Sequence, residues 1–406
     1  MATTLTSSRI ETRPNWAEVS LSALRHNFRV VQKRVGADVT ICAVVKCNAY
    51  GHGVEECAPA LEQAGAKWFG VTSTDEGVVL RECGITGRVL VLCGLYPGEE
   101  EEALRHSLTP AVFRLEQAEG IARAAARLGL THRVAIHLKI DTGMARLGLP
   151  LSELESFAES VKRLPQIELE GVFSHLASSE VLDDEDTARQ IERYEAALRT
   201  LANHGLHPAL RHLANSGAVS ARPNTWHNFV RPGLLLYGYE YAPSRHDGSP
   251  ITDVPALPLK PVLSWKTHIL GLRDVPTGQP LGYGGAYVTP APARIAAVSV
   301  GYGDGLSRKI SVRNGHGSAC DMDHAVGRGE VLIRGQRAPI VGRVSMDLTL
   351  IDVTRIPGAA IGDEVVLIGR SGDQQISAWD LARSSDTVVY ETLCNLSKRV
   401  PRRHAD

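Results

Sequence analysis

Apolar runs and helical spacings alternate along the first 240 residues of the chain. In residues 21–35, Leu24, Phe28 and Val31 recur at intervals of four and three, which predicts an amphipathic helix. Similar spacings predict further helices at 54–64, 116–128, 152–163 and 184–204. Between the helical stretches lie eight strand-like runs, at 39–46, 68–74, 88–94, 109–113, 134–140, 169–175, 210–216 and 229–238.

The eight runs are continuously apolar rather than alternating, which is typical of strands buried on both faces. Such strands separated by helices predict a closed parallel (β/α)8 barrel, with an open doubly wound sheet as the alternative. The polar residues favour the barrel. A barrel collects the ends of its strands on one face, where barrel enzymes hold their chemistry. Five polar residues lie at or just beyond the ends of the first, fifth, sixth, seventh and eighth runs: Lys46, Lys139, His175, Ser216 and Arg231.

Beyond residue 240 the pattern changes. A proline-rich stretch at 241–261 precedes short β-type runs bounded by Gly, Pro and Asp, at 294–300, 330–334, 338–341 and 364–368. A short helical stretch near 376–384 and an apolar segment containing Tyr390 follow. We therefore expect a barrel domain over residues 1–250 and a mainly β domain over 251–406, where the first residues of the chain can pair with the second domain.

Composition narrows the classes of function. With 406 residues, 43% of them hydrophobic, and a formal net charge of −1, the chain can bury a large core and has no basic surface for nucleic acid or anionic membrane. Its seven cysteines are an odd number without a C-x-x-C pair, which favours a reducing compartment. The first residues lack a signal-peptide pattern, and no apolar run reaches spanning length. We expect a cytoplasmic protein that acts on a small molecule.

One glycine-rich loop gathers metal-binding residue types without a recognised ligand spacing. We expect this loop, residues 313–329, to be solvated, and we expect no metal in the protein. The residues concerned are His316, Cys320, Asp321, Asp323 and His324.

The first apolar run ends in a lysine. Residues 44–53 read VVKCNAYGHG, so Lys46 leaves the run and a turn of Asn, Gly and His follows it. A surface lysine that caps a strand is the common alternative. However, a lysine that loses its proton forms a Schiff base with an aldehyde, and Tyr50 with the neighbouring glycines offers a hydroxyl and close backbone approach for a phosphate.

Other segments carry candidate groups in the same order along the chain. Arg146 lies on a loop after the fifth run and suits a carboxylate or phenolate, although a solvated loop arginine is the alternative. Tyr302 stands between glycines in SVGYGDG, where a turn aromatic is the usual reading. His175 ends FSH and Arg231 interrupts VRPG, and either of them can be a satisfied structural residue.

Together these segments resemble those of alanine racemases, over about residues 12–403. VVKCNAYGHG resembles the lysine motif that binds pyridoxal phosphate (PLP) in that family, with Cys47 where a smaller residue is usual. The resemblance implies that Lys46 carries PLP, that Arg231 hydrogen-bonds the pyridine nitrogen, and that His175 bonds to Arg231 in turn. It further implies cofactor contacts from Tyr50, Leu92, Asn215, Ser216, Gly233, Leu234 and Tyr390.

The resemblance also assigns the substrate-facing residues. Arg146 and the backbone of Met346 are expected to hold the substrate carboxylate, and Lys139 matches a lysine that is often carbamylated. Lys46 and Tyr302 are expected to be the two bases. An arginine donates a hydrogen bond to the pyridine nitrogen without protonating it, which makes the ring a weaker electron sink and favours racemisation over transamination.

The resemblance implies a two-base alanine racemase that supplies D-alanine for peptidoglycan and works as a homodimer with shared sites. Three alternatives stay open: a broad-specificity amino-acid racemase, a basic amino-acid decarboxylase of the same two-domain arrangement, and a PLP carrier without catalysis. In decarboxylases of that arrangement a carboxylate faces the pyridine nitrogen, so Arg231 argues against that class. A pure carrier has no need of Tyr302.

Overall fold

The computed structural model describes residues 13–314 and 329–406, which divide into two compact units. Residues 21–262 form the first, called the barrel unit below, and residues 13–20 with 263–405 form the second, the β unit. Each unit has its own sheet. The architecture of a (β/α)8 barrel followed by a mainly β domain is therefore confirmed.

Eight parallel strands form the sheet of the barrel unit, in the order β10-β2-β3-β4-β5-β6-β8-β9. A hydrogen bond from Arg231 N to Ala214 O, 3.0 Å, links the segments that follow β10 and β9 and so brings the two ends of the sheet together. The short β7 (Leu149–Pro150) pairs with β6 outside this ring. The strands are β2 (Thr40–Val44), β3 (Trp68–Val71), β4 (Arg88–Val91), β5 (Leu108–Val112), β6 (Val134–Asp141), β8 (Ile167–Phe173), β9 (Leu210–His212) and β10 (Phe229–Val230).

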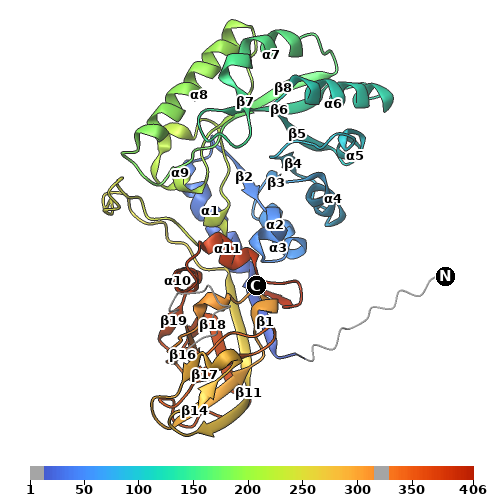
Figure 1. The fold of residues 1–406 in the computed structure, drawn as a ribbon. Coiled ribbons are helices and arrows are strands. Elements are labelled where there is room, and N and C mark those ends of the chain that lie inside the picture. Colours follow the sequence, from blue (N-terminus) through green and yellow to red (C-terminus); the bar gives the residue numbers. More distant parts are fainter. Residues whose placement is uncertain (1–12, 315–328) are drawn as a thin grey trace, which may run out of the picture. The chain divides into compact units, whose positions relative to one another are not determined.

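Helices surround the barrel strands (Figure 1). The first helix spans 21–35, as its spacing predicts, and it buries Leu24, Phe28 and Val31. Buried apolar side chains on one face of each helix cover the strands, which leaves the polar faces to solvent. The helices are α1 (Leu21–Val35), α2 (Lys46–Tyr50), α3 (Val54–Gln63), α4 (Thr74–Glu82), α5 (Glu100–Arg105), α6 (Leu115–Arg127), α7 (Leu154–Val161), α8 (Glu185–Asn203) and α9 (Ser216–Ala221).

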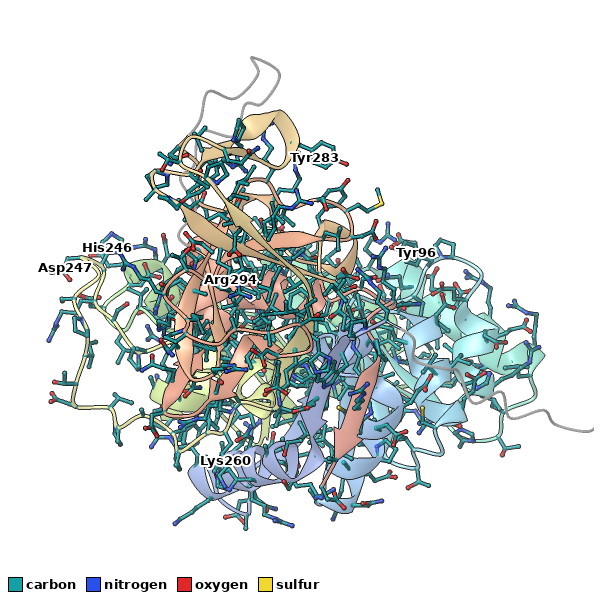
Figure 2. All side chains as sticks on the ribbon, turned by 90° about the horizontal axis from the view of Figure 1, so that it is seen from below. Tyr96, His246, Asp247, Lys260, Tyr283 and Arg294 are labelled. Atoms are coloured by element: carbon teal, nitrogen blue, oxygen red, sulfur yellow. The ribbon has the colours of Figure 1, made fainter. Side chains whose placement is uncertain are left out.

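The eighth predicted run of the barrel differs in the structure. The eighth run, 229–238, contains only a two-residue strand, because Pro232 lacks an N–H for a sheet ladder and Leu234–Tyr237 winds into a 3₁₀ turn. The proline-rich stretch 241–261 contains no long helix or strand. It carries His246 and Asp247 on an exposed loop (Figure 2), where Asp183 Oδ1 accepts a hydrogen bond from His246 N, 2.7 Å.

The β unit is a nine-stranded sheet whose central part closes on itself through a pairing of β18 with β11. Its longest strand, β11, alternates buried residues such as Trp265, Thr267 and Ile269 with outward-facing ones. Strand β1 pairs antiparallel with β11 and parallel with β20, so the start of the described chain belongs to this sheet. The strands are β1 (Asn15–Ser20), β11 (Leu263–Val275), β14 (Ala293–Val298), β15 (Glu330–Ile333), β16 (Gln336–Val341), β17 (Thr349–Asp352), β18 (Glu364–Ser371), β19 (Gln374–Ile376) and β20 (Arg402–Ala405).

Smaller elements complete the β unit. A separate two-stranded ribbon pairs β12 (Pro280–Leu281) with β13 (Tyr287–Val288). Two helices, α10 (Ala378–Ser384) and α11 (Val389–Cys394), lie in the segment between β19 and β20, and α11 contains Tyr390. Among the described helices, none is both long and apolar enough to cross a bilayer.

Candidate active site

The cationic residues predicted at the strand ends lie close together in the barrel unit. Lys46 lies two residues beyond the end of β2, Lys139 lies near the end of β6, and Arg231 directly follows β10. Because the strands are parallel, these positions share the carboxyl-terminal edge of the barrel. Burial, together with the positive charges of Arg231, Arg146 and Lys46 and against an opposing effect of Cys93, lowers the pKa of Lys139 to about 8. These cations therefore lie within electrostatic reach of one another.

A left-handed turn follows Lys46. Cys47, Asn48, Ala49 and Tyr50 all have φ between 53° and 54°, a conformation that costs an L-residue about 1–2 kcal/mol. Hydrogen bonds hold the turn: Cys47 N donates to Glu76 Oε1 over 2.6 Å, and Val54 N donates to Asn48 Oδ1 over 2.8 Å. The sequence predicted a turn here but not this one, because none of the four residues is glycine.

The left-handed turn delivers Tyr50 to a cradle of hydroxyl and backbone groups. The Tyr50 ring stacks on Tyr237 with centroids 4.8 Å apart, and a Cβ built on Gly233 would lie 2.3 Å from the Tyr50 hydroxyl. Gly233 N donates to Ser216 Oγ over 2.9 Å. Hydroxyls and backbone beside glycine are the donors that a phosphate group takes, and the close approach at Gly233 leaves no room for a side chain.

Asn215 and Leu234 flank the cradle in the chain. Asn215 caps helix α9, since its Oδ1 accepts from Ala218 N over 3.2 Å. Leu234 is buried directly after Gly233. Leu92 follows β4 and packs against the buried cluster of Cys42, Trp68, Leu90 and Phe229.

Arg231 is buried, and hydrogen bonds hold both terminal nitrogens of its guanidinium. Nη1 donates to His212 Nδ1 over 3.0 Å and to His212 O over 2.9 Å. Nη2 donates to Ser174 O over 2.7 Å and to Leu213 O over 3.2 Å. Burial lowers the pKa of Arg231 to about 10. Even so, the group stays a cation and a pure donor at neutral pH.

The imidazole in contact with Arg231 is that of His212 rather than that of His175 expected above. Among the described contacts, His175 meets Arg231 only through space: burial, then Arg231 and Arg146, hold the pKa of His175 well below its ordinary value. Its backbone is fixed from helix α8, because Gln190 Nε2 donates to His175 O over 3.0 Å. The sequence pointed away from His212, because this histidine lies inside an apolar run rather than beyond its end.

Arg146 lies on an exposed loop after β6 that is shaped by Asp141. The Oδ1 atom of Asp141 accepts from Gly143 N over 2.9 Å and from Ala145 N over 3.1 Å. Tyr96, which is 73% exposed, stands in the loop after β4 (Figure 2). The loops at the carboxyl-terminal edge of the barrel therefore carry a solvent-facing cation and a solvent-facing aromatic.

The β unit brings Tyr302 and Met346 together. Tyr302 N donates to Ser345 O over 2.9 Å, and Gly303 N donates to Met346 O over 3.0 Å. A Cβ on Gly301 would lie 2.3 Å from Met346 O, so only glycine allows the two loops to lie this close. The side chains of Tyr302 and Met346 are 43% and 52% exposed, which leaves both open to a ligand or a partner.

Asp304 anchors the Tyr302 turn and was not found from the sequence. Its fully buried carboxylate accepts from Arg13 Nη1 and Nη2 over 2.6 and 2.8 Å, from Arg399 Nε over 2.8 Å and from Gly301 N over 2.8 Å. A glycine-rich turn such as SVGYGDG gives no sign of this, because the two arginines come from opposite ends of the chain.

The sequence also led to predictions about metal binding and about the cysteines. Residues 315–328, most of the loop considered above for metal binding, lie outside the described residues. Across residues 13–314 and 329–406, no group of three or more His, Cys, Asp or Glu side chains could hold a metal ion. The six described cysteines are free thiols.

Fold and site together define a barrel enzyme with a lysine-centred cationic site, joined to a β unit that presents a tyrosine. The family models for the N-terminal and C-terminal domains of alanine racemase match residues 19–241 and 262–404. The chain belongs to the alanine racemase family.

Individual relatives agree along nearly the whole chain. Alanine racemase of Halothermothrix orenii is 40% identical over 393 residues, which is 97% of each chain, and that of Symbiobacterium thermophilum is 41% identical over 392 residues, 96% of this chain and 97% of its own. Among solved structures, alanine racemase of Clostridium difficile 630 superposes with a TM-score of 0.86 at 32% identity, covering 97% of this chain and 96% of its own. The Bacillus anthracis enzyme, solved with bound L-Ala-P, gives 0.84 at 33% identity, covering 97% and 95%.

Proposed function

We propose that the chain interconverts L-alanine and D-alanine with PLP held at Lys46. The observation that carries this proposal is the grouping of Lys46, Lys139, Arg146 and Arg231 at one edge of the barrel, beside the cradle of Tyr50, Ser216 and Gly233. A lysine that reacts with an aldehyde and a cradle that takes a phosphate are the two ends that PLP requires. When bound, PLP withdraws electrons from Cα of an attached amino acid and so makes its hydrogen acidic.

Each residue of the barrel edge has a role in this proposal. Tyr50, Ser216 and the backbone of Gly233 and Leu234 hold the phosphate, with Asn215 shaping the start of α9 and Leu92 packing on the site. Arg231 donates to the pyridine nitrogen but cannot give up its proton, which limits electron withdrawal by the ring. Proton removal and return at Cα then become the main outcome, rather than transamination.

In this proposal a guanidinium and a backbone N–H bind the substrate carboxylate. Arg146 presents a planar pair of donors from its exposed loop, which fits a carboxylate in two-point contact. The Met346 backbone N–H is proposed as a further donor, since Met346 lies against Tyr302 in the β unit. Lys139, with its pKa lowered to about 8, is proposed to be carbamylated and so to brace Arg146.

Two bases exchange the proton on opposite faces of Cα. Lys46 Nζ takes or returns the proton on one face, and Tyr302 Oη does so on the other. We propose that the working unit is a homodimer in which Tyr302 and Met346 of one chain serve the Lys46 site of the partner. The exposure of Tyr302 and Met346, and of Tyr283 at 71% (Figure 2), supports a partner-facing surface on the β unit. Tyr390 is proposed to contact the cofactor from α11.

The reaction itself separates this function from its alternatives. Purified protein is incubated with L-alanine, L-serine and L-lysine in turn, and the D-enantiomer and carbon dioxide are both measured. The proposal expects D-alanine with the highest kcat/KM and no carbon dioxide. A preference for lysine would make the chain a broad-specificity racemase, carbon dioxide from basic amino acids would make it a decarboxylase, and binding of PLP without either product would make it a carrier.

The cellular setting follows from the same reasoning. We propose that the enzyme works in the cytoplasm and supplies D-alanine for peptidoglycan. Free thiols at all six described cysteines support a reducing compartment, because paired cysteines are the rule in oxidising ones.

A further inference from the structure

A row of hydrogen-bonded side chains runs through the interior of the barrel unit from Arg231. Arg231 Nη1 meets His212 Nδ1 at 3.0 Å, and His212 Nε2 meets His137 Nδ1 at 2.8 Å. His137 Nε2 then meets Glu170 Oε2 at 3.3 Å, and Arg88 donates to both Glu170 oxygens over 3.0 and 2.8 Å. Since Arg88 is the first residue of β4, the row ends near the amino-terminal edge of the barrel, away from the proposed cofactor.

The direction of every hydrogen bond in this row is fixed by its two ends. A guanidinium only donates, so His212 Nδ1 must accept and the proton of neutral His212 lies on Nε2. That N–H donates to Nδ1 of His137, which leaves the proton of neutral His137 on Nε2, facing a carboxylate that only accepts. All three bonds therefore point from Arg231 toward Glu170.

The surroundings favour neutral histidines. The His212 ring stacks on the Phe173 ring with centroids 4.7 Å apart, and its centroid lies 4.5 Å from that of the Phe229 ring. Both His137 and His212 are completely buried. Burial lowers the pKa of His137 and holds that of His212 well below its ordinary value. For Glu170, burial acts to raise the pKa, but the hydrogen bonds from His137 and Arg88 bring it below its ordinary value. Glu170 is thus the negatively charged member of the row, and its carboxylate is shared between His137 and the Arg88 guanidinium.

Two features of the backbone make room for the row. Opposite Ile136 and His137 of β6, the partners on β8 are Leu169 and Gly171, so Glu170 is the extra residue of a β-bulge. At Gly171, a Cβ would lie 2.5 Å from His137 Nδ1. The bulge changes the direction of the Glu170 carboxylate, and the glycine leaves space for the His137 imidazole. Both departures from a regular barrel strand allow the contact between Glu170 and His137.

We infer that Glu170 is the counter-ion of Arg231, acting through His137 and His212 as a positioning residue for the proposed cofactor contact. Among the described contacts, Arg231 meets carbonyl oxygens and an imidazole but no carboxylate, although it is buried among other cations. Burying a charge without a counter-charge is unfavourable. The row supplies a negative charge at a distance, shared with Arg88, while the four bonds of Nη1 and Nη2 leave the Arg231 Nε–H as the donor for a ring nitrogen. This inference rests on the proposed role of Arg231 toward PLP.

The first test is made on the wild-type protein, and variants serve only to assign its signals. Holoenzyme labelled with ¹⁵N in histidine and arginine is studied by NMR, and the signals of His137 and His212 are assigned by their loss in His137→Gln and His212→Gln proteins. Both imidazoles are expected to be neutral, with the proton on Nε2, and a scalar coupling should join His212 Nε2 to His137 Nδ1. The opposite tautomer at either histidine, or a charged imidazole, would overturn the inference.

The second test removes the charge and keeps the shape. In Glu170→Gln the amide oxygen can still accept from His137 Nε2, but the bond loses its charge assistance and Arg88 loses one of its two acceptors. The inference expects the Nε2–H signals of His137 and His212 and an Arg231 N–H signal to shift together. The matched control is Glu101→Gln, because Glu101 pairs with Arg105 and Arg127 on the exposed surface of the barrel helices. This control should leave all three signals in place.

Catalysis gives a further readout. Glu170→Gln is expected to lower kcat for alanine roughly tenfold, the scale on which outer partners of a site act, with KM within about twofold, while Glu101→Gln leaves both unchanged. A shift confined to His137, with kcat unchanged, would make Glu170 a local structural residue and refute the inference. Failure of the wild-type protein to racemise alanine would instead refute the proposed function, and the tautomers would still be readable.

Discussion

The two carboxylate oxygens of Asp304 face the Nη1 and Nη2 atoms of Arg13 over 2.6 and 2.8 Å. This two-point contact ties the start of the described chain to the turn that carries Tyr302, and Arg399 binds the same carboxylate from the other end of the chain. Asp304 is completely buried, whereas the side chains of Arg13 and Arg399 are 30% and 38% exposed. The position of the proposed second base therefore depends on an ion cluster rather than on packing alone.

The first prediction is that Asp304→Asn both destabilises the protein and slows racemisation. An amide cannot neutralise two arginines, and its NH₂ group would face one of them. We expect the free energy of unfolding to fall by about 2 kcal/mol, less than for a fully buried pair because both arginines reach solvent. Urea denaturation measures this change, and kcat should fall more than KM changes.

The control for Asp304→Asn is Asp363→Asn. Asp363 accepts two hydrogen bonds from Arg334 in the same unit, but that pair is exposed. We expect a loss below about 1 kcal/mol and unchanged kcat. Equal effects of the two variants on kcat would show that the Tyr302 turn does not depend on Asp304.

The second prediction concerns the phosphate cradle. Gly233→Ala places a Cβ 2.3 Å from the Tyr50 hydroxyl, so this hydroxyl must move away from residue 233. We expect PLP affinity to fall at least tenfold, which is about 1.4 kcal/mol. Titration of cofactor-free protein with PLP, followed by absorbance, measures the affinity.

Gly271→Ala is the matched control for Gly233→Ala. A Cβ on Gly271 meets nothing within 4 Å, so this variant makes the same chemical change without a clash. PLP affinity should stay within about twofold of the wild type. Wild-type affinity in Gly233→Ala would mean that the phosphate binds elsewhere.

The sequence predicts those parts of the fold and the site that depend on interactions between residues close together in the chain. The barrel strands were predictable because each is a continuously apolar run, and burial on both faces demands that pattern locally. Lys46 and Arg231 were predictable as residues at the ends of such runs. The strand β1 was expected only as a possible partner of the second domain, because its pairing with β11 and β20 joins residues more than two hundred positions apart.

Three parts of the site lacked any local signal. The left-handed turn at Cys47–Tyr50 uses residues that ordinarily avoid positive φ, and its supporting bond from Cys47 N to Glu76 comes from another helix. The β-bulge that exposes Glu170 to His137 depends on the register of two strands, which sequence alone does not give. Asp304 looked like one more polar residue in a glycine-rich turn.

The third prediction concerns Lys139 and pH. Burial and neighbouring cations lower its pKa to about 8, so a much larger fraction of Lys139 is neutral near pH 8 than for an ordinary lysine. A neutral amine is the form that reacts with carbon dioxide. We expect a carbamate ¹³C NMR signal from protein in ¹³C-bicarbonate buffer, growing as the pH rises through about 8 and absent in Lys139→Arg.

The sign of the Lys139 effect on stability runs the other way. A lysine with a lower pKa in the folded state binds its proton more weakly there than in the unfolded state. Its protonation therefore destabilises the fold. This unfavourable contribution is largest below the folded pKa and disappears above the unfolded pKa. Lys139→Met should therefore raise the unfolding free energy more at pH 6 than at pH 10. A carbamate signal that survives in Lys139→Arg would assign the modification to another lysine.

The fourth prediction is that inactive chains complement one another. Lys46→Ala lacks the cofactor lysine and Tyr302→Phe lacks the second base, so each homodimer should be inactive. Mixed dimers contain one site with both wild-type groups if the sites are shared between chains. We expect re-associated mixtures to recover about a quarter of wild-type activity, because half of the dimers are mixed and each has one intact site. Mixtures that stay inactive after verified exchange would place both bases in one chain.

The last prediction is that each base serves one enantiomer. Two bases on opposite faces of Cα cannot substitute for each other, because each reaches only the hydrogen on its own side. We propose that Lys46 takes the α-hydrogen of D-alanine and that Tyr302 takes that of L-alanine. A phenol is a weak base at neutral pH unless hydrogen bonds and nearby cations stabilise its phenolate. His175 suits that task, since burial and the charges of Arg231 and Arg146 hold its pKa well below the ordinary value and keep it neutral. A neutral imidazole can exchange a hydrogen bond with the phenol without adding a second positive charge. Tyr302→Phe should therefore still bind PLP and both enantiomers, exchange the α-hydrogen of D-alanine with deuterated solvent, and lose exchange for L-alanine by at least a hundredfold. Mass spectrometry of each recovered enantiomer gives the two rates separately, and equal residual exchange from both would exclude Tyr302 as the base for L-alanine.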